Sequence, residues 1–258
     1  MRSCRQYGIM LVEVEYGMKI RILGSADMNS ACFSASYLIN DRCLMDIPEG
    51  TSRQLRLLGI QSESIEAVLL THLHGDHTLG LPVWALKKTK MSPPPQDGSI
   101  CICADRAQKD ALEHLIHSSF PTSFSAEKTG RFFRWVCESQ FDLGGLHIQR
   151  IPVRHGALPD CFGYLVSDGS VTVGFTGDAC LCDGVREILS AAELAFCDCD
   201  LITGNEKHMG IDDLEALAEE YPGTRIVASH LKDETRQALL QMQPKGIAPA
   251  TDGAEWIL

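Results

Sequence analysis

Three histidines and one aspartate are concentrated in the six-residue segment His72-Leu-His-Gly-Asp-His77. This segment follows Ala67-Val-Leu-Leu, an apolar run that predicts a buried strand. Loops at the ends of buried strands hold functional groups on a rigid support. Neutral imidazole and carboxylate are the ligands that Zn²⁺ and related divalent ions prefer. The segment therefore predicts a metal site at the carboxyl end of a strand, in a fold that brings further ligands to the same place.

Other candidate ligands also end predicted strands. His155, Asp178 and His230 each come directly after an apolar segment with strand character. A further histidine, His208, stands just before a predicted helix. Each of these residues has a structural interpretation when it is taken alone. Together they lie where the rim of a single pocket would collect them.

The order of the predicted elements indicates an α/β fold. Strands are expected near 18–23, 34–39, 42–46, 67–71, 99–103, 131–137, 146–153, 161–167, 170–175, 194–202 and 224–228. Helices are expected near 50–59, 79–88, 105–118, 183–191, 211–220 and 233–242. Each half of the chain begins with strands and then alternates strands with helices. This order predicts a four-layer αββα sandwich, in which two mixed sheets pack face to face and the helices lie outside.

The chain is expected to form one domain, over residues 18–258. Residues 1–17 are interpreted as an N-terminal extension without an assigned role. Two closing strands are expected on either side of a turn at Asp252-Gly253.

Composition limits the classes of function. Acidic residues outnumber basic residues by 34 to 23, and the net charge of −11 argues against a protein that holds nucleic acid by its overall charge. No apolar run reaches the roughly 20 residues of a membrane span, and the first 17 residues lack the pattern of a secretory signal. We therefore expect a cytoplasmic protein without a membrane partner.

Most of the 11 cysteines are expected to be free thiols in a reducing compartment. They include three Cys-x-Cys pairs, at 101/103, 180/182 and 197/199. These pairs are interpreted as small apolar residues. A further, structural metal site made by them is the alternative.

The complete set of candidate ligands resembles that of the metallo-β-lactamase superfamily, and the similarity runs from about Met18 to the end of the chain. By this resemblance, three histidines would hold one divalent ion: His72, His74 and His155. A second ion would be held by Asp76, His77 and His230, and Asp178 would bridge the two. Zinc is the expected metal, with manganese or iron as alternatives.

Three further segments resemble the phosphodiesterase branch of that superfamily: Pro152-Val-Arg-His-Gly, Cys161-Phe-Gly-Tyr-Leu and Gly174-Phe-Thr-Gly-Asp. The branch includes tRNase Z and the cyclic phosphodiesterase of bacterial phosphonate breakdown. The resemblance implies that a hydroxide bridging the two metals attacks phosphorus. It also implies that Asp76 orients this nucleophile while His208 donates a proton to the leaving oxygen.

Two departures from tRNase Z favour a small substrate over tRNA. His155 and Asp178 are 23 residues apart, which leaves no room for the long arm with which that family grips tRNA. The segment Leu201-Ile-Thr-Gly-Asn, which precedes His208, lacks that family's glutamate. We therefore expect a small phosphodiester or a cyclic nucleotide-like substrate and no nucleic-acid partner. A homodimer is compatible with the sequence.

Two alternatives to a phosphodiesterase stay open. The same pair of metals could serve an acyl hydrolase that acts on a thioester, a lactone or a similar substrate. The chain could also be a metal-binding regulator without turnover. A purely structural site would be closed by four ligands, which argues against the regulator.

Overall fold

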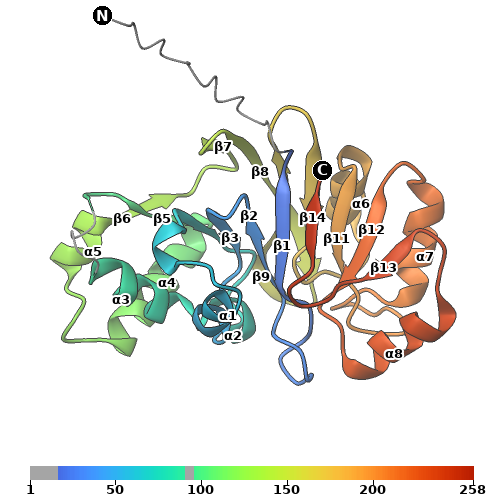
Figure 1. Ribbon diagram of the computed structural model, residues 1–258, viewed down its shortest axis with the longest axis horizontal. Helices are drawn as coiled ribbons and strands as arrows, with labels where there is room; N and C mark the ends of the chain where they lie inside the picture. The colour runs from blue at the N-terminus through green and yellow to red at the C-terminus, as the bar shows by residue number, and fades with distance from the viewer. Residues whose placement is uncertain (1–16, 91–95) are drawn as a thin grey trace, which may run out of the picture.

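The computed structural model describes residues 17–90 and 96–258 (Figure 1). The expected N-terminal extension lies outside this range, except for Gly17. The strands are β1 (Lys19–Gly24), β2 (Ser36–Ile39), β3 (Cys43–Met45), β4 (Ala67–Leu69), β5 (Ile100–Cys103), β6 (Phe133–Val136), β7 (Gln140–Leu143), β8 (Leu146–His155), β9 (Leu158–Ser167), β10 (Thr172–Phe175), β11 (Leu194–Asp198), β12 (Arg225–Ser229), β13 (Ile247–Pro249) and β14 (Glu255–Ile257). The helices are α1 (Thr51–Leu57), α2 (Gly75–Thr78), α3 (Leu81–Thr89), α4 (Arg106–Ser119), α5 (Ala126–Phe132), α6 (Asp183–Ala191), α7 (Ile211–Glu220) and α8 (Asp233–Met242), with a short 3₁₀ helix at Ser62–Ser64.

Within the described residues, these strands form two seven-stranded sheets. The first sheet has the order β14-β1-β2-β3-β4-β5-β6, and the second has the order β13-β12-β11-β10-β9-β8-β7. Strands β3 to β6 are parallel to one another, as are β10 to β13. Parallel strands end at the same edge of their sheet, so the loops that follow them gather there.

The two sheets pack face to face, and helices cover their outer faces (Figure 1). Side chains of β2 illustrate the layering, because Tyr37 and Ile39 lie in the core between the sheets while Leu38 points to the helix side. In β11, Phe196 faces the core between the sheets and Cys197 faces the helices. Strands that are covered on both faces are largely apolar, as β11 is from Leu194 to Cys197. The predicted four-layer αββα sandwich is thus confirmed.

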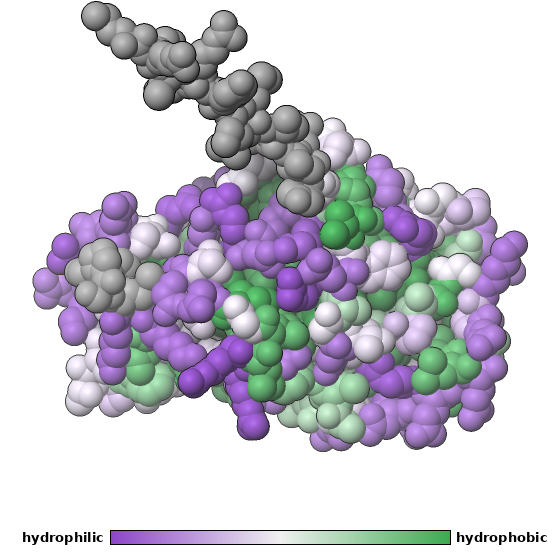
Figure 2. All heavy atoms as spheres, viewed as in Figure 1, coloured by the Kyte–Doolittle hydropathy of each residue, from purple (hydrophilic) through white to green (hydrophobic). Residues whose placement is uncertain are grey.

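The surface agrees with this layering. Figure 2 shows hydrophilic and hydrophobic residues interspersed over the face seen in Figure 1. Among the helices of residues 17–90 and 96–258, none combines the length and apolar character needed to cross a membrane.

Helix α5 and strand β7 were not expected. Helix α5 begins after Ser125, whose hydroxyl accepts a hydrogen bond from the Lys128 amide at 3.3 Å, and it takes up the start of the strand expected at 131–137. Strand β7 pairs with β8 through a tight turn at Gly144-Gly145, where both glycines have positive φ. A Gly-Gly pair between two alternating segments is a hairpin signal, so β7 could have been predicted.

The closing strands differ from the expectation. Strands β13 and β14 do not pair across the Asp252-Gly253 turn, because β13 pairs with β12 in the second sheet and β14 pairs with β1 in the first. The turn instead carries the chain from one sheet to the other. The Asp252 carboxylate fixes it there by accepting hydrogen bonds from the Ser25 hydroxyl at 2.6 Å and from the Phe33 amide at 2.9 Å.

Candidate metal centre

All the residues that the sequence analysis assigned to the site lie together at one edge of the two sheets. They are His72, His74, Asp76, His77, His155, Asp178, His208 and His230. The loop after β4 and helix α2 supply four of them. The ends of β8, β10 and β12 and the segment before α7 supply the others.

Three histidines and Asp178 form the first cluster of possible ligands, which we call the three-histidine group: His72, His74, His155 and Asp178. Their ligand atoms all lie within 4.8 Å of one another. Nδ1 of His74 is 3.4 Å from Nε2 of His155, and Nε2 of His72 is 3.8 Å from a carboxylate oxygen of Asp178. The three rings thus direct one nitrogen each toward a common point.

Asp76, His77 and His230 form a second cluster, the Asp76 group. The Asp76 carboxylate lies 3.7 Å from Nε2 of His77 and 3.5 Å from Nε2 of His230. Asp178 reaches this group as well, with Oδ1 at 3.3 Å from His77 and Oδ2 at 3.3 Å from His230. Asp178 therefore stands between the two groups, with both oxygens engaged.

The buried nitrogens of these groups indicate a cation. Nε2 of His72, of His77 and of His230 is buried without a hydrogen-bond partner in the described chain. Buried polar atoms without partners are rare in native proteins, and such atoms indicate a bound water or ion. Imidazole nitrogens around shared carboxylates are a suitable donor set for divalent metal ions. The residues present therefore fit the metals that the sequence predicts.

On the side of the first sheet, Asp46 holds the histidine loop in place. Its carboxylate accepts hydrogen bonds from the Thr71 amide at 2.9 Å and from the Thr71 hydroxyl at 2.8 Å, and it pairs with Nδ1 of His77 at 2.8 Å. The Thr71 hydroxyl also lies 3.0 Å from Nδ1 of His72. Such outer contacts fix the tautomer and orientation of a metal-binding histidine.

On the side of the second sheet, Asp198 is the supporting carboxylate that corresponds to Asp46. It pairs with Nδ1 of His208 at 2.9 Å and accepts a hydrogen bond from the Ala179 amide at 3.0 Å, next to Asp178. Nδ1 of His230 is 3.7 Å from Asp198 and 3.8 Å from Asp200. The carboxylate that pairs with His208 thus comes from the end of β11, and not from the segment 201–205 in which the sequence analysis looked for one.

The sequence analysis missed both Asp46 and Asp198. Each stands at the carboxyl end of a buried parallel strand, β3 and β11, on the same edge as the ligands. An acidic residue in that position is the same signal that singled out Asp178. That signal could have found both residues.

Two backbone features bring the ligands of the second sheet into reach. Gly177 has φ +58°, and a Cβ at this position would lie 2.9 Å from Thr71, so the glycine lets the end of β10 approach the histidine loop. His230 has φ +55°, a left-handed conformation that is costly for a residue with a side chain. Such strain is found at functional sites, where the surrounding structure imposes it.

The charge distribution differs between the two groups. Burial, together with nearby His77, lowers the pKa of His72 well below its usual range, which keeps the ring in the neutral form that binds metals. At His230, burial would lower the pKa, but the nearby carboxylates of Asp178 and Asp76 raise it to about 9. The Asp76 group therefore attracts positive charge strongly, whereas the three-histidine group offers neutral nitrogens.

His208 completes the arrangement. Its ring stacks on that of His230, with centroids 5.5 Å apart, and meets the ring of His155 edge-on at 4.7 Å. Burial would lower the pKa of His208, but the hydrogen bond to Asp198 raises it overall. A raised pKa favours the protonated ring, which can donate a proton from Nε2.

The groups open into a cavity of about 450 Å³, which we call the main cavity. Asp27, Met28 and Asn29 of the β1–β2 loop form one part of its wall. Lys207 and Lys232 also line it, and Lys232 is held by Asp200 at 2.6 Å. The cavity therefore combines a cluster of histidines and carboxylates with two lysines.

The cysteines contribute nothing to these groups. Within residues 17–90 and 96–258, no group of possible metal ligands includes a cysteine. Cys101 and Cys103 lie in the core between the sheets with their sulfur atoms 3.7 Å apart, and Cys197 and Cys199 lie in the core beneath the helices of the second sheet. These positions agree with the interpretation of these two pairs as small apolar residues.

Comparison with known proteins gives a consistent result. The family model described as beta-lactamase superfamily domain matches residues 42–231. The chain is similar to the ribonuclease Z of Methanothermobacter thermautotrophicus, with 51% identity over 263 residues, covering 82% of this chain and 84% of the relative.

Matches to other ribonuclease Z proteins are shorter. That of Nanoarchaeum equitans is 31% identical over 113 residues, covering 42% of this chain and 32% of the relative. The match to the Haloferax volcanii protein has 35% identity over 98 residues and covers 37% of this chain and 30% of the relative. The chain thus spans about a third of the length of these two relatives.

Solved structures agree in fold. The metallo-beta-lactamase fold protein YhfI from Bacillus subtilis superposes with a TM-score of 0.77 at 19% identity, covering 94% of this chain and 100% of that one. A structure described as a new diphosphatase from the PhnP family gives a TM-score of 0.74 at 19% identity, covering 93% and 97%. At these identities, the similarity establishes the architecture alone.

Proposed function

The chain belongs to the phosphodiesterase branch of the beta-lactamase superfamily, and from this premise we propose that it is a dinuclear metal-dependent phosphodiesterase acting on a small phosphodiester. One observation carries the proposal. Three buried ring nitrogens, on His72, His77 and His230, lack partners and surround the two oxygens of Asp178. Two cations that share one carboxylate would satisfy all of these atoms.

The two groups of ligands would each hold one ion. His72, His74 and His155 would hold the first, Asp76, His77 and His230 would hold the second, and Asp178 would be shared. Zinc is the expected metal, with manganese or iron as alternatives. When bound, such ions supply Lewis acidity toward a phosphoryl oxygen and lower the pKa of water.

The protein residues would position the reactants and move protons. Asp76 carries a carboxylate oxygen beside both histidines of its group, where it can accept a hydrogen bond from the attacking water and orient it. His208 lies on the other side of His230, held by Asp198, and would donate the proton from Nε2 to the leaving oxygen. Lys207 and Lys232 at the rim would attract the anionic diester.

A small substrate agrees with the size and charge of the molecule. The main cavity has a volume of about 450 Å³, and the whole chain carries a net charge of −11. Between His155 and Asp178 lie only β9, β10 and the short connections that flank them. A substrate held mainly by the cavity itself therefore fits better than a long polyanion, which depends on an extended basic surface.

Cleavage of an RNA phosphodiester is the second candidate. The relatives named ribonuclease Z favour it, above all the one that is 51% identical. These relatives put in doubt the expectation that nucleic acid is not a partner. The same metal ligands and the same proton donor would serve both substrates.

A substrate panel tests the proposal on the metal-loaded protein. We expect kcat/KM to be highest for phosphodiesters such as bis-p-nitrophenyl phosphate, compared with p-nitrophenyl acetate, a lactone and a thioester. Preferred acyl turnover would contradict the phosphodiesterase, and the absence of any turnover would favour the regulator. A precursor tRNA cleaved with a higher kcat/KM than any small diester would favour the second candidate.

His208→Ala tests the proton donor. Metal content is expected to persist, while kcat falls by about 10²- to 10⁴-fold for a diester with a poor alkoxide leaving group. A p-nitrophenolate leaving group needs no proton and should show a much smaller loss. His147→Ala is the matched control, because that histidine is exposed and pairs with Asp142. Loss of metal from His208→Ala would identify His208 as a ligand instead.

A further inference from the structure

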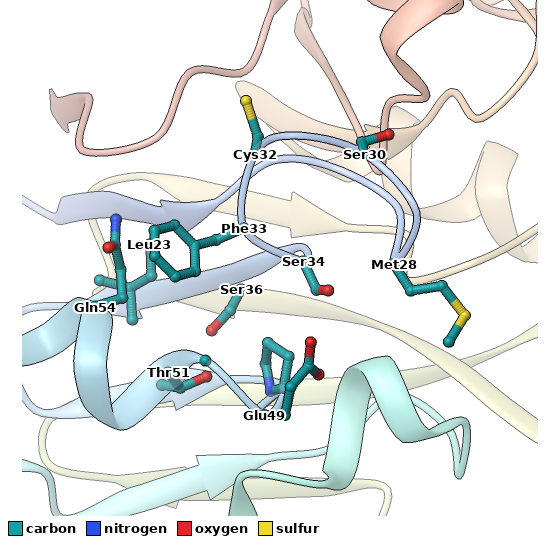
Figure 3. A pocket seen from close by; sticks show the side chains of 12 residues that line it. Leu23, Met28, Ser30, Cys32, Phe33, Ser34, Ser36, Glu49, Thr51 and Gln54 are labelled. Atoms are coloured by element: carbon teal, nitrogen blue, oxygen red, sulfur yellow. The ribbon is translucent and has the colours of Figure 1, made fainter.

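A second cavity adjoins the main cavity. It has a volume of about 190 Å³ and lies between the β1–β2 loop and the segment that leads from β3 into α1, and we call it the side cavity. Figure 3 shows the loop that carries Ser30 and Cys32 arching over it, with Glu49 and Thr51 on the opposite side. Met28 lines both cavities. A ligand could therefore extend from one cavity into the other past this side chain.

The wall of the side cavity is fixed in place. The Ser30 hydroxyl donates hydrogen bonds to the Asp27 carboxylate and to the carbonyl of Leu231, the residue after His230. At the other end of the loop, the Phe33 amide donates to Asp252 at 2.9 Å. These bonds tie the loop to the second sheet and to the closing turn. The cavity is thus preformed, which reduces the entropy cost of binding.

Buried polar groups line the floor of the side cavity. Thr51 is only 3% exposed, and its hydroxyl has no hydrogen-bond partner among the described residues. The side chain of Gln54 is also buried there, at 6% exposure. A buried hydroxyl without a partner is unfavourable, and a ligand in the cavity would supply the missing hydrogen bond.

An aromatic side chain forms another wall. The Phe33 ring lies against Gly50, where an added Cβ would be 2.9 Å from Cδ1 of the ring. A residue with a side chain at position 50 would displace the Phe33 ring, so glycine is required there. An aromatic face beside a hydroxyl, an amide and a carboxylate is how proteins recognise a nucleobase, by stacking and by hydrogen bonds to its edge.

Size and charge restrict the ligand further. The volume of about 190 Å³ is below the range of about 300–1,000 Å³ that drug-sized ligands occupy, so the cavity accommodates one ring system. Glu49 at its rim repels phosphate and can accept a hydrogen bond from an exocyclic amino group. The lysines that would attract phosphate line the main cavity instead.

We propose that the side cavity binds the nucleobase of a substrate whose phosphodiester lies in the main cavity. The substrates are then nucleoside phosphodiesters with one base recognised beside the scissile bond. Phe33 stacks on this base, and Thr51 and Gln54 bind its edge. The inference rests on the proposed phosphodiesterase and specifies its substrate class.

Two kinds of ester with the same leaving group separate the contribution of the base from that of the phosphate. They are the p-nitrophenyl esters of the four common nucleoside 5′-monophosphates and methyl p-nitrophenyl phosphate. For the metal-loaded protein, we expect at least one nucleoside ester to exceed the methyl ester in kcat/KM by about tenfold or more. Thr51→Val and Phe33→Leu are each expected to reduce this ratio several-fold, through an increase in KM for the nucleoside ester.

The controls distinguish a base site from a structural role. Thr51→Val keeps the shape of the side chain and breaks no hydrogen bond among the described residues, so its melting temperature should not fall. Thr122→Val changes an exposed threonine at a distance and should leave the ratio unchanged. A wild-type ratio near one, or a ratio that neither cavity variant alters, would overturn the base site.

Direct binding separates this inference from the proposed function. If the metal-loaded protein hydrolyses none of these esters, the proposed phosphodiesterase fails. Calorimetric titration with the four nucleoside 5′-monophosphates then tests the side cavity alone. Binding that weakens in Thr51→Val and Phe33→Leu supports the base site, and the absence of binding to the wild-type chain overturns it.

Discussion

The two sheets contribute to the candidate metal centre in different ways. The first sheet supplies a continuous segment, from His72 to His77, in the loop and short helix after β4. The second sheet supplies single residues from separate strand ends, namely His155, Asp178 and His230. The first contribution is thus encoded locally in the chain. The second exists only once β8, β10 and β12 are assembled in one sheet and packed against the first.

The supporting carboxylates repeat this difference. Asp46 bonds to the backbone and side chain of Thr71 and to His77, so that one residue organises the whole histidine loop. Asp198 bonds to His208 and to the Ala179 amide, but it approaches His230 only to 3.7 Å. The first sheet therefore supports candidate metal ligands directly, whereas the second supports mainly the proposed proton donor.

The largest effect on metal content and activity is expected at Asp178, where the contributions of the two sheets meet. Asp178→Ala removes the carboxylate that contacts both groups, and we expect it to lower the content of both ions and to reduce kcat/KM by at least about a thousandfold, equivalent to several kcal/mol of transition-state stabilisation. Asp76→Ala removes a ligand of one group only and should mainly lower the content of one ion. Metal analysis of the purified proteins, together with kcat/KM for bis-p-nitrophenyl phosphate, measures both effects.

A surface carboxylate provides the control for this pair. Asp142→Asn changes an exposed residue of β7 and should leave metal content and activity unchanged. Retention of two ions per chain by Asp178→Ala would show that the three-histidine group and the Asp76 group hold their metals independently. The idea of a shared carboxylate would then be wrong.

An effect of intermediate size is expected for the two supporting carboxylates, Asp46 and Asp198. Asp46→Asn puts an amide where a carboxylate faces Thr71 and His77, and metal affinity is expected to fall by about 10- to 100-fold. Asp198→Asn should change metal affinity less and reduce kcat more, above all for alkoxide leaving groups, because it releases His208. Chelator competition gives the affinities, and steady-state kinetics with two leaving groups give kcat. Equal loss of metal affinity in both variants would remove the distinction between the sheets.

The same contrast explains what the sequence could predict. The histidine segment is a local pattern, and the alternation of apolar residues gave most strands and helices, including α7 and α8 at their observed bounds. His155, Asp178 and His230 were found because each ends an apolar strand. That these strand ends meet around Asp178 depends on the pairing of the strands and the packing of the two sheets. The sequence could suggest that convergence but could not provide the distances.

The features that escaped prediction depend on tertiary contacts. Asp46 and Asp198 stand at the ends of buried strands, as Asp178 does, but only their hydrogen bonds across the site show which residues they support. The closing strands β13 and β14 belong to different sheets, and the turn between them is held by bonds from Asp252 to the β1–β2 loop, a contact between residues more than 200 positions apart. The side cavity likewise requires that loop to fold over the start of α1. No periodic pattern in the chain encodes these contacts.

The smallest effect concerns the bonds that join the sheets. The Tyr37 hydroxyl on β2 bonds to the Ser229 hydroxyl on β12 at 2.6 Å, and the Tyr164 hydroxyl on β9 donates to the Leu70 carbonyl, just beyond β4, at 2.8 Å. Both tyrosines are buried. Each bond therefore crosses between the sheets within the core, close to a strand end that carries a candidate ligand.

Tyr164→Phe is expected to cost more than Tyr37→Phe, about 2 against about 1 kcal/mol in the free energy of unfolding. The Leu70 carbonyl is fixed in the backbone and loses this donor, whereas the Ser229 hydroxyl, which accepts from Tyr37, can rotate toward another donor. Urea denaturation of the metal-loaded proteins measures both changes, with Tyr221→Phe as the control, because its hydroxyl pairs with exposed Glu220. An equal cost for the two core variants would mean that Ser229 is held as rigidly as the backbone. The second sheet would then be as rigid at the end of β12 as the first sheet is at the end of β4.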